Sequence, residues 1–463
     1  MKFSSKQFVK LFLRLFLCAA VTGMEAQEIR RALPVEPTAA PAPQMAPNVA
    51  PQQPPSALGP ATQAPAFSPP ANVSSVPAGP AGVNDTARFL AGLPVSEGSP
   101  LASFTRDPAW QQHAIFFDEA WAKLAARQFT GIREWEVNYL PDATQPLPVV
   151  FYMFSGPDFL YAHQFFPNAS TYILAGTEPI GPLPDVLRFG GPALGPVLQN
   201  LQKSLNNVLS FSFFITKDMK TDLKREELKG TLPIFYVFLA RAGKTITDIS
   251  LITLDKSGQP HPASPNEKST SLTPGVRITF ANAPGGAEQT LYYFTTDLSN
   301  EGIRSQPGFL KFCEAQGTGG SLLKSASYLM FENGFSRVRD FLLQRSKAIV
   351  QDDSGIPISA FDPGRWLLRY FGSYAGPIEL FKQYYQPQLY GLYQQSNPAP
   401  LSFGIGYRWN PRQSTLIVAT LRGGDFVAPM PAVEIPPPPT APPPPRVATP
   451  DPRVYRPKKP FSP

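Results

Sequence analysis

The stretch that decides the fold runs from Leu147 to Asp185: LPVVFYMFSGPDFLYAHQFFPNASTYILAGTEPIGPLPD. It begins with an apolar run at 149–154 that is rich in β-branched and aromatic residues, as in a strand covered on both faces. Residues 155–158, Ser-Gly-Pro-Asp, break this run, and a short helical segment follows. A second strand at 171–174 stops at Gly176. Strand, helix and strand in so short a span predict a right-handed parallel unit.

Polar side chains gather where these two strands end. Ligands of open α/β sheets bind beyond the carboxyl ends of parallel strands, and Ser155, Asp158, His163 and Glu178 lie in that region. Ser155 is expected to cap the helix, with Asp158 three residues later as the capping-box acid. An acid at a helix start also disfavours a phosphate site there, because it places an anion beside an anion.

The rest of the body alternates between helices and strands. Asp107 and Pro108 predict the start of one helix, and apolar spacing predicts further helices at 194–208, 335–345 and 377–395. Strands are predicted at 211–215, 234–240, 247–253, 276–280, 290–295, 328–331, 348–351 and 366–371, with a closing hairpin of 403–409 and 415–420. The middle strands are expected to be antiparallel, since their connections are too short for crossover helices. The predicted fold class is a mixed α/β sheet: a parallel strand–helix–strand unit, then antiparallel strands, then a further α/β section.

The two ends of the chain differ from this body. Three lysines precede an apolar segment at 11–21, which is too short for a membrane span of roughly 20 apolar residues and is typical of a secretory signal peptide. Residues 1–26 are assigned to that peptide, with Ala20, Gly23 and Ala26 as alternative cleavage sites. Of the 56 prolines, 14 fall in 34–80 and 15 in 429–463. We therefore expect disordered Pro-rich arms at 27–84 and 429–463 around a globular body at 85–428.

Cysteine content and charge limit the function classes. The chain has two cysteines, Cys18 and Cys313, so removal of residues 1–26 leaves one thiol and no intramolecular disulfide. The same removal takes away four basic residues and one acid, leaving 37 Lys and Arg against 33 Asp and Glu, a net charge of +4. This is no nucleic-acid footprint. The expected partners are a cell-envelope polymer or another envelope protein, and no transmembrane span is expected in the mature chain.

Two acidic corners are the candidate catalytic site. Asp158 and Glu178 follow neighbouring strands, while Asp352 and Asp353 follow another buried strand. If the corners lie side by side, four carboxylates could bind a hard cation or share a proton, as in a hydrolase or a metal-dependent enzyme. In the competing interpretation, all four carboxylates serve in helix caps and turns. The sequence assigns no cofactor-binding residue and identifies neither a metal nor a cofactor.

Other motifs fail or stay ambiguous. A nucleotide-cofactor fold, including that of methyltransferases, also has a strand, a glycine turn, a helix and a strand ending in an acid, but only Gly156 stands where such folds use two or three glycines. No serine lies in a G-x-S-x-G elbow. Tyr384, Tyr385, Tyr390 and Tyr393 share a predicted helix. They are expected in core and rim positions, with stacking on sugars or packing on a partner as the alternative.

Two segments resemble uncharacterised exported bacterial proteins: FYMFSGPDFLYAHQFFPNASTYILAGTEPIG at 151–181 and VQDDSGIPISAFDPGRWLLRYFG at 350–372. The resemblance covers about residues 147–410. It implies a bacterial exported protein, periplasmic or extracellular, and carries no activity with it. The expected role is a non-catalytic envelope binding or scaffolding module, with the carboxylate enzyme as the alternative.

Overall fold

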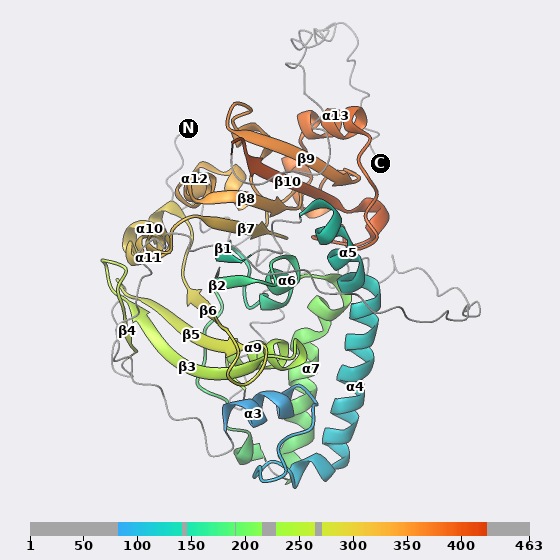
Figure 1. Cartoon of the computed structure of the whole chain (residues 1–463), viewed down its shortest axis with the longest axis vertical. Coiled ribbons are helices and arrows are strands. Elements are labelled where there is room, and N and C mark those ends of the chain that lie inside the picture. The colour runs from blue at the N-terminus through green and yellow to red at the C-terminus, as the bar shows by residue number, and fades with distance from the viewer. Residues whose placement is uncertain (1–81, 141–145, 190, 215–227, 264–270, 424–463) are drawn as a thin grey trace, which may run out of the picture. The chain divides into compact units, whose positions relative to one another are not determined.

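The computed structural model describes residues 82–140, 146–189, 191–214, 228–263 and 271–423. Their strands form one ten-stranded sheet in the order β4-β3-β5-β6-β2-β1-β7-β8-β10-β9, which Figure 1 shows. The strands are β1 (Leu147–Tyr152), β2 (Ala169–Gly176), β3 (Thr245–Leu254), β4 (Pro260–Pro262), β5 (Thr273–Ala281), β6 (Glu288–Thr295), β7 (Gly319–Leu323), β8 (Ser346–Gln351), β9 (Trp366–Gly372) and β10 (Thr415–Leu421). The predicted mixed α/β sheet is confirmed.

Five strands in the middle of the sheet are parallel. β1 pairs in parallel with β2 and β7, β2 pairs with β6, and β7 pairs with β8. From β1 the chain moves outward through β2 to β6, and then returns to the other side of β1 for β7 and β8. The direction of winding therefore reverses between β1 and β7, which makes their carboxyl ends the switch point of the sheet.

Antiparallel strands extend both ends of this parallel centre. β3 and β5 add to β6 as predicted for the middle section, and β10 lies antiparallel between β8 and β9.

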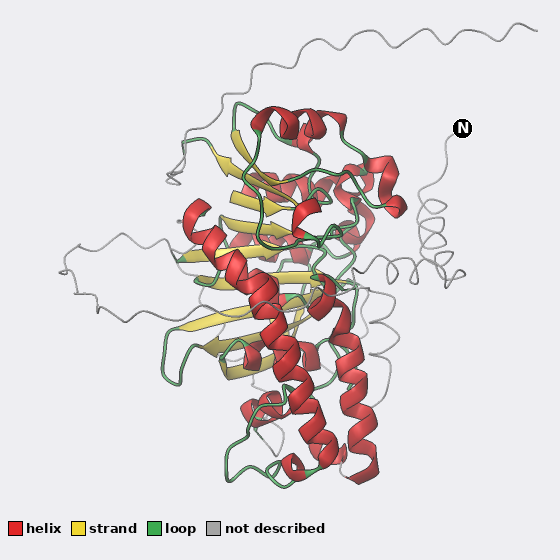
Figure 2. Ribbon diagram, turned by 90° about the vertical axis from the view of Figure 1, so that its right-hand side faces the viewer, coloured by secondary structure: helices red, strands yellow, loops and turns green. Residues whose placement is uncertain are grey.

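Helices cover both faces of the sheet (Figures 1 and 2). They are α3 (Val83–Leu90), α4 (Pro108–Leu124), α5 (Thr130–Tyr139), α6 (Phe159–Phe165), α7 (Leu194–Phe211), α9 (Leu232–Arg241), α10 (Asn300–Ser305), α11 (Gly308–Ala315), α12 (Ser336–Arg345) and α13 (Pro387–Ser396). Val150 and Tyr152 of β1 face the core that contains α3, α4, α5, α6, α7 and α9, whereas Phe151 faces the core that contains α11 and α12. No helix among the described residues is long and apolar enough to cross a membrane.

The predicted helix start at Asp107 and Pro108 and the parallel unit are confirmed at the residue level. Asp107 caps α4 by accepting the Ala109 amide at 2.8 Å. In the parallel unit, Val150 pairs with Tyr172 across β1 and β2. The body begins at Val83 with α3, two residues inside the range assigned to the spacer. The signal peptide, the spacer up to residue 81 and the tail from residue 429 lie outside the described residues.

Residues 234–240 form helix α9, so the predicted strand there is wrong. The run is apolar at every position, and every residue from Leu232 to Ala240 is buried. A fully buried helix has no polar face, and therefore its sequence shows no period of 3.6 that would separate it from a buried strand. Pro233 in the first turn is the one local signal for a helix.

Four further predictions are corrected. Residues 329–331 are a 3₁₀ turn in place of the strand predicted at 328–331, and the strand of this region is β7, which begins with Gly319 and Gly320. A Cβ at Gly319 would lie 1.9 Å from the Val149 carbonyl oxygen, so close strand packing requires glycine.

Residues 212–214 form no strand, and 215 lies outside the described residues. The helix predicted at 377–395 is divided into a 3₁₀ segment (Glu379–Tyr384) and α13. The 403–409 segment has one isolated bridge, because β10 pairs with β8 and β9 instead.

The central strand should carry much of the stability. Phe151 is fully buried, and its ring centroid lies 5.1 Å from that of Phe341. Phe151→Ala is expected to lower the free energy of unfolding by about 3–5 kcal/mol, measured by urea titration. Ile115→Ala, at a side chain that is 50% exposed, is the control and should change it by less than about 0.5 kcal/mol. Equal losses in the two variants would contradict the assignment of β1 to the core.

Candidate functional site at the switch point

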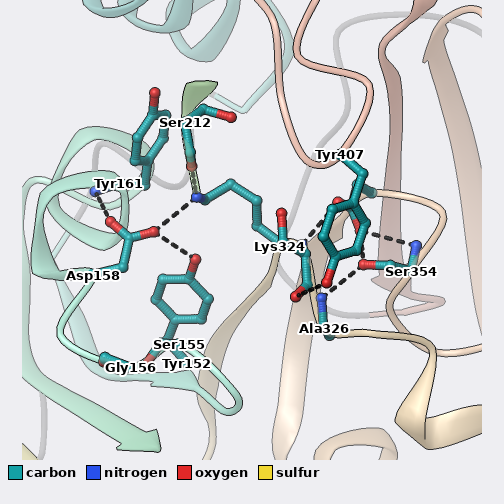
Figure 3. A network of polar contacts seen from close by, with 12 residues as sticks. Tyr152, Ser155, Gly156, Asp158, Tyr161, Ser212, Lys324, Ala326, Ser354 and Tyr407 are labelled. Atoms are coloured by element: carbon teal, nitrogen blue, oxygen red, sulfur yellow. Dashed lines mark hydrogen bonds and ion pairs between the residues drawn. The ribbon is translucent and has the colours of Figure 1, made fainter. Parts of the chain in front are cut away.

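A buried ion pair joins the carboxyl ends of β1 and β7 (Figure 3). Asp158 is the N-cap of α6, in the turn after β1, and Lys324 is the first residue after β7. Lys324 Nζ lies 2.8 Å from Asp158 Oδ2, and the side chains are 1% and 2% exposed. Two opposite charges removed from water in this way interact strongly, and each would be costly to bury alone.

Other polar groups surround the ion pair. The Tyr152 hydroxyl donates to Asp158 Oδ2 at 2.8 Å, and the Tyr161 amide donates to Asp158 Oδ1 at 3.2 Å. Lys324 also donates to the carbonyl oxygen of Ser212, just beyond α7, and its ammonium lies 4.2 Å from the centroid of the Tyr161 ring. Burial raises the pKa of Asp158, and the Lys324 charge opposes that rise. The lysine therefore ties β7 to α6 and to the end of α7.

The second acidic corner lies beside the first. Asp352 Oδ1 accepts the Ser354 amide at 2.9 Å and the Ser354 hydroxyl at 2.5 Å, while Oδ2 accepts the Ser325 amide at 2.9 Å. Asp353 Oδ2 accepts the Tyr328 hydroxyl at 2.7 Å. Burial raises the pKa of both carboxyls, and the neighbouring Asp352 charge helps to raise that of Asp353 to about 7.

The loop after β7 has an unusual backbone. Ser325, Ser327 and Tyr328 have φ angles of 53°, 55° and 54°, in the left-handed region that non-glycine residues rarely adopt. The Tyr407 hydroxyl bonds the Ser325 carbonyl oxygen at 3.0 Å and the Ser327 hydroxyl at 2.8 Å. These bonds and the Asp352 carboxylate hold the loop in a conformation that costs on the order of 1–3 kcal/mol per strained residue.

Glu178, the other acid of the first corner, has partners of its own. The Tyr293 hydroxyl of β6 donates to the Glu178 carbonyl oxygen at 2.9 Å and lies 3.4 Å from Oε2. A Cβ at Gly176 would lie 2.5 Å from Glu178 Oε2 and 2.9 Å from Gly156 Cα, so the carboxylate sits against the turn after β1. Glu178 faces Tyr293, whereas Asp158 faces Lys324.

The two acidic corners therefore adjoin without converging. Asp158 binds the Lys324 ammonium, whereas Asp352 binds the backbone amide of the next residue, Ser325. In the part of the chain that the structure describes, no three His, Cys, Asp or Glu side chains form a group that could hold a metal ion. The predicted cap is corrected: Asp158 caps α6, and the Ser155 hydroxyl bonds the Gly156 carbonyl oxygen at 2.8 Å.

The remaining candidate, His163, is also engaged within the core. Its Nδ1 lies 3.2 Å from the Tyr172 hydroxyl, and its ring stacks on that of Phe159. Burial lowers the pKa of His163 to about 3, so the imidazole is neutral at physiological pH. Its contacts are those of a core histidine.

The sequence analysis missed the residues that organise the site, Lys324 first among them. Lys324 is the single charge in the run GGSLLKSASYLM, and a lone lysine in such a run is a signal for a buried ion pair. A strand predicted at 328–331 leaves Lys324 in a loop, where a lysine is ordinarily exposed and gives no such signal. In the sequence, Tyr152, Tyr161 and Tyr407 resemble ordinary core residues. Tertiary structure sets the partners of the Tyr152 and Tyr407 hydroxyls and places the Tyr161 ring against Lys324.

The strand order β6-β2-β1-β7-β8 is that of doubly wound sheets that bind nucleotide cofactors at the switch point. The residues here do not fit such a group. The turn after β1 is buried from Ser155 to Asp158, its acid holds Lys324, and the acid after β2 is 2% exposed against Tyr293. No protein-family model, curated protein or solved structure matches the chain.

Removing one charge of the ion pair should lower the free energy of unfolding more than removing both charges. Lys324→Met leaves the Asp158 charge buried without its partner, and Asp158→Asn does the same to Lys324. Each single change is expected to lower the free energy of unfolding by about 3–5 kcal/mol. In the double variant the two losses should be strongly non-additive, because no unpaired charge remains. Urea titrations of the four proteins check this, and strictly additive losses would show that the two charges do not interact.

The pKa of Asp353 predicts a pH dependence of stability. The unfolded chain ionises this carboxyl near 3.8, whereas the folded chain keeps the proton up to about pH 7. As the pH rises through this window, the group lowers the free energy of unfolding by about 1.4 kcal/mol per pH unit. Asp353→Asn removes this dependence.

Urea titrations from about pH 4 to pH 8 should therefore show the Asp353→Asn variant gaining stability over the wild type up to pH 7, with no further gain above it. Asp362→Asn, at an exposed aspartate, is the matched control and should keep the wild-type profile. A stability difference between Asp353→Asn and the wild type that does not vary with pH would contradict the raised pKa.

Proposed function

We propose that the protein is an exported bacterial envelope protein whose body is a non-catalytic binding or scaffolding module. One observation supports the proposal that the module is not catalytic. The carboxylates of Asp158, Glu178, Asp352 and Asp353 are 1%, 2%, 1% and 5% exposed, and each faces a donor of its own chain. A general acid, general base or metal ligand must reach a substrate or an ion. These four groups reach backbone amides, tyrosines, a serine and a lysine instead.

The same contacts support a structural role for the switch point. A buried network of ion pairs and hydrogen bonds favours one arrangement of the loops that it joins, because another arrangement would separate its buried partners. Lys324 and Asp352 join segments that lie far apart in the sequence, including the end of α7 and the loop after β7. Such a body suits a module that presents a fixed surface to a partner.

The sequence supports the envelope part of the proposal. A secretory signal at 1–26 and Pro-rich arms on both sides of the body suit a protein that spans a distance from an attachment point. Five basic residues end the second arm: Arg446, Arg453, Arg456, Lys458 and Lys459. They suit an anionic envelope polymer, or an acidic surface of another envelope protein.

The alternative is a hydrolase or metal-dependent enzyme, and one observation favours it. The pKa of Asp353 is raised to about 7, the range in which a carboxyl can act as a general acid at neutral pH. Perturbed carboxyls also mark structural networks, and Asp353 accepts a hydrogen bond from the buried Tyr328 hydroxyl.

Fractionation of bacteria that express the tagged full chain tests the proposal. The full chain is expected in the envelope fraction, a chain without residues 2–26 in the cytoplasm, and a chain without residues 429–463 in the soluble periplasmic fraction. Asp353→Asn should leave envelope retention unchanged, because retention needs no ionisable acid at that position. Cytoplasmic location of the full chain would contradict export. Full retention without residues 429–463 would contradict tethering by the tail.

A further inference from the structure

Three exposed apolar side chains define a surface that we call the tyrosine platform: Leu380, Tyr385 and Tyr390. They are 54%, 45% and 45% exposed. Of the large hydrophobic side chains exposed among the described residues, the other two, Ile115 and Val137, lie in α4 and α5. Leu380, Tyr385 and Tyr390 are gathered in one short segment around the start of α13, and such clustering indicates a binding surface.

The platform is built on buried aromatic rings. Tyr385 stacks on Tyr374 with ring centroids 5.7 Å apart, and Tyr390 is inclined to Tyr385 by 44° with centroids 6.4 Å apart. Tyr374 is 5% exposed, and its hydroxyl accepts the Gln386 amide at 2.9 Å. Tyr393 beneath it donates to the backbone of β9 and β10. The exposed rings are therefore held in fixed positions by the sheet.

Two adjacent, inclined tyrosine rings make the type of surface on which a polyproline II helix packs. Such a helix has three residues per turn and loses little conformational entropy on binding, since proline already fixes its backbone. Domains that recognise Pro-rich segments use grooves lined by aromatic side chains in this way. The chain itself carries two runs of four prolines, at 436–439 and 442–445.

The position of the chain exit allows the tail to reach the platform. The described chain leaves β10 at Leu421, while the Tyr393 hydroxyl bonds the Leu416 carbonyl oxygen near the other end of this strand. Tyr393, in the same helix as Tyr390, thus contacts β10 five residues before Leu421, roughly 17 Å from it along the strand. Twelve residues, 424–435, precede the first proline run, and in a polyproline II conformation they span about 37 Å.

We propose that the proline runs at 436–445 dock on the tyrosine platform of the same chain. The prolyl rings pack on the faces of Tyr385 and Tyr390, with Leu380 at the edge of the contact. Docking holds the start of the tail on the body and leaves its basic end, from Arg446, free for another partner. This inference goes beyond the envelope role and does not depend on it.

Photo-crosslinking of the chain without residues 1–26 tests this docking. Ala441→Cys, between the two proline runs, receives a benzophenone maleimide. Cys313, the one other thiol, is fully buried and therefore protected in the folded protein. Mass spectrometry should place the crosslinks within residues 374–396. Tyr385→Ser with Tyr390→Ser should reduce them about tenfold, because two stacking contacts are lost.

Two controls complete the experiment. Ile115→Ser with Val137→Ser removes equally exposed apolar side chains elsewhere and should leave the crosslink yield unchanged, and thermal unfolding verifies that both double variants fold. A mixture of ¹⁵N-labelled and unlabelled chains should give crosslinks within one isotopic form. Crosslinks between the two forms would assign the platform to the tail of a second copy. That outcome would overturn docking within one chain, as would crosslinks that are scattered or insensitive to the tyrosine substitutions.

Discussion

The ion pair between Lys324 and Asp158 is the constraint on which the switch point depends. The desolvation of two such charges costs several kcal/mol each, and the structure offsets that cost with close contact and further hydrogen bonds. Tyr152 and the Tyr161 amide complete the contacts of the carboxylate, and the Ser212 carbonyl completes those of the lysine. Because the partners come from β1, β7, α6 and the end of α7, the pair forms only when the two halves of the parallel sheet are in place.

This arrangement explains how the turn at the switch point of a doubly wound sheet can be buried among the described residues. In sheets that bind cofactors, the turn after the first strand stays accessible, so that backbone amides can meet the ligand. Here that turn is buried, and the lysine ammonium lies over the Tyr161 ring at the same end of the sheet. Three of the large hydrophobic side chains exposed on the described body, Leu380, Tyr385 and Tyr390, lie elsewhere, around the start of α13.

Local patterns predicted the parts of the fold whose causes are local. The β1–α6–β2 unit, α4 with its Asp107 cap, and β8 were predicted because their strand patterns, cap residues and breaks agree within a few residues. Helix α9 and strand β7 were not predicted. Helix α9 has no polar face, and β7 begins with two glycines, of which Gly319 is required by close packing against Val149. In each case tertiary burial determined the element and left no periodic signal in the sequence.

The candidate site was likewise only partly predictable from the sequence. The sequence placed Asp158, Glu178, Asp352 and Asp353 at the carboxyl end of the sheet, because each directly follows a strand. Their partners come from distant segments, such as Lys324 for Asp158 and Tyr293 for Glu178, and no spacing in the sequence predicts those pairings. The candidate acids could therefore be predicted from the sequence, whereas their burial and their hydrogen-bond and ion-pair partners could not.

We propose that these acids hold the fold together and do not open to a substrate. Native-state hydrogen exchange of the Tyr161 and Ser325 amides tests it most directly, because these amides donate to Asp158 and Asp352. If the network is structural, both amides exchange only on global unfolding, with the same free energy and denaturant dependence as the β1 and β8 amides. Exchange through a low-energy local opening of the two loops would contradict the claim and would return these carboxylates to solvent and to catalysis.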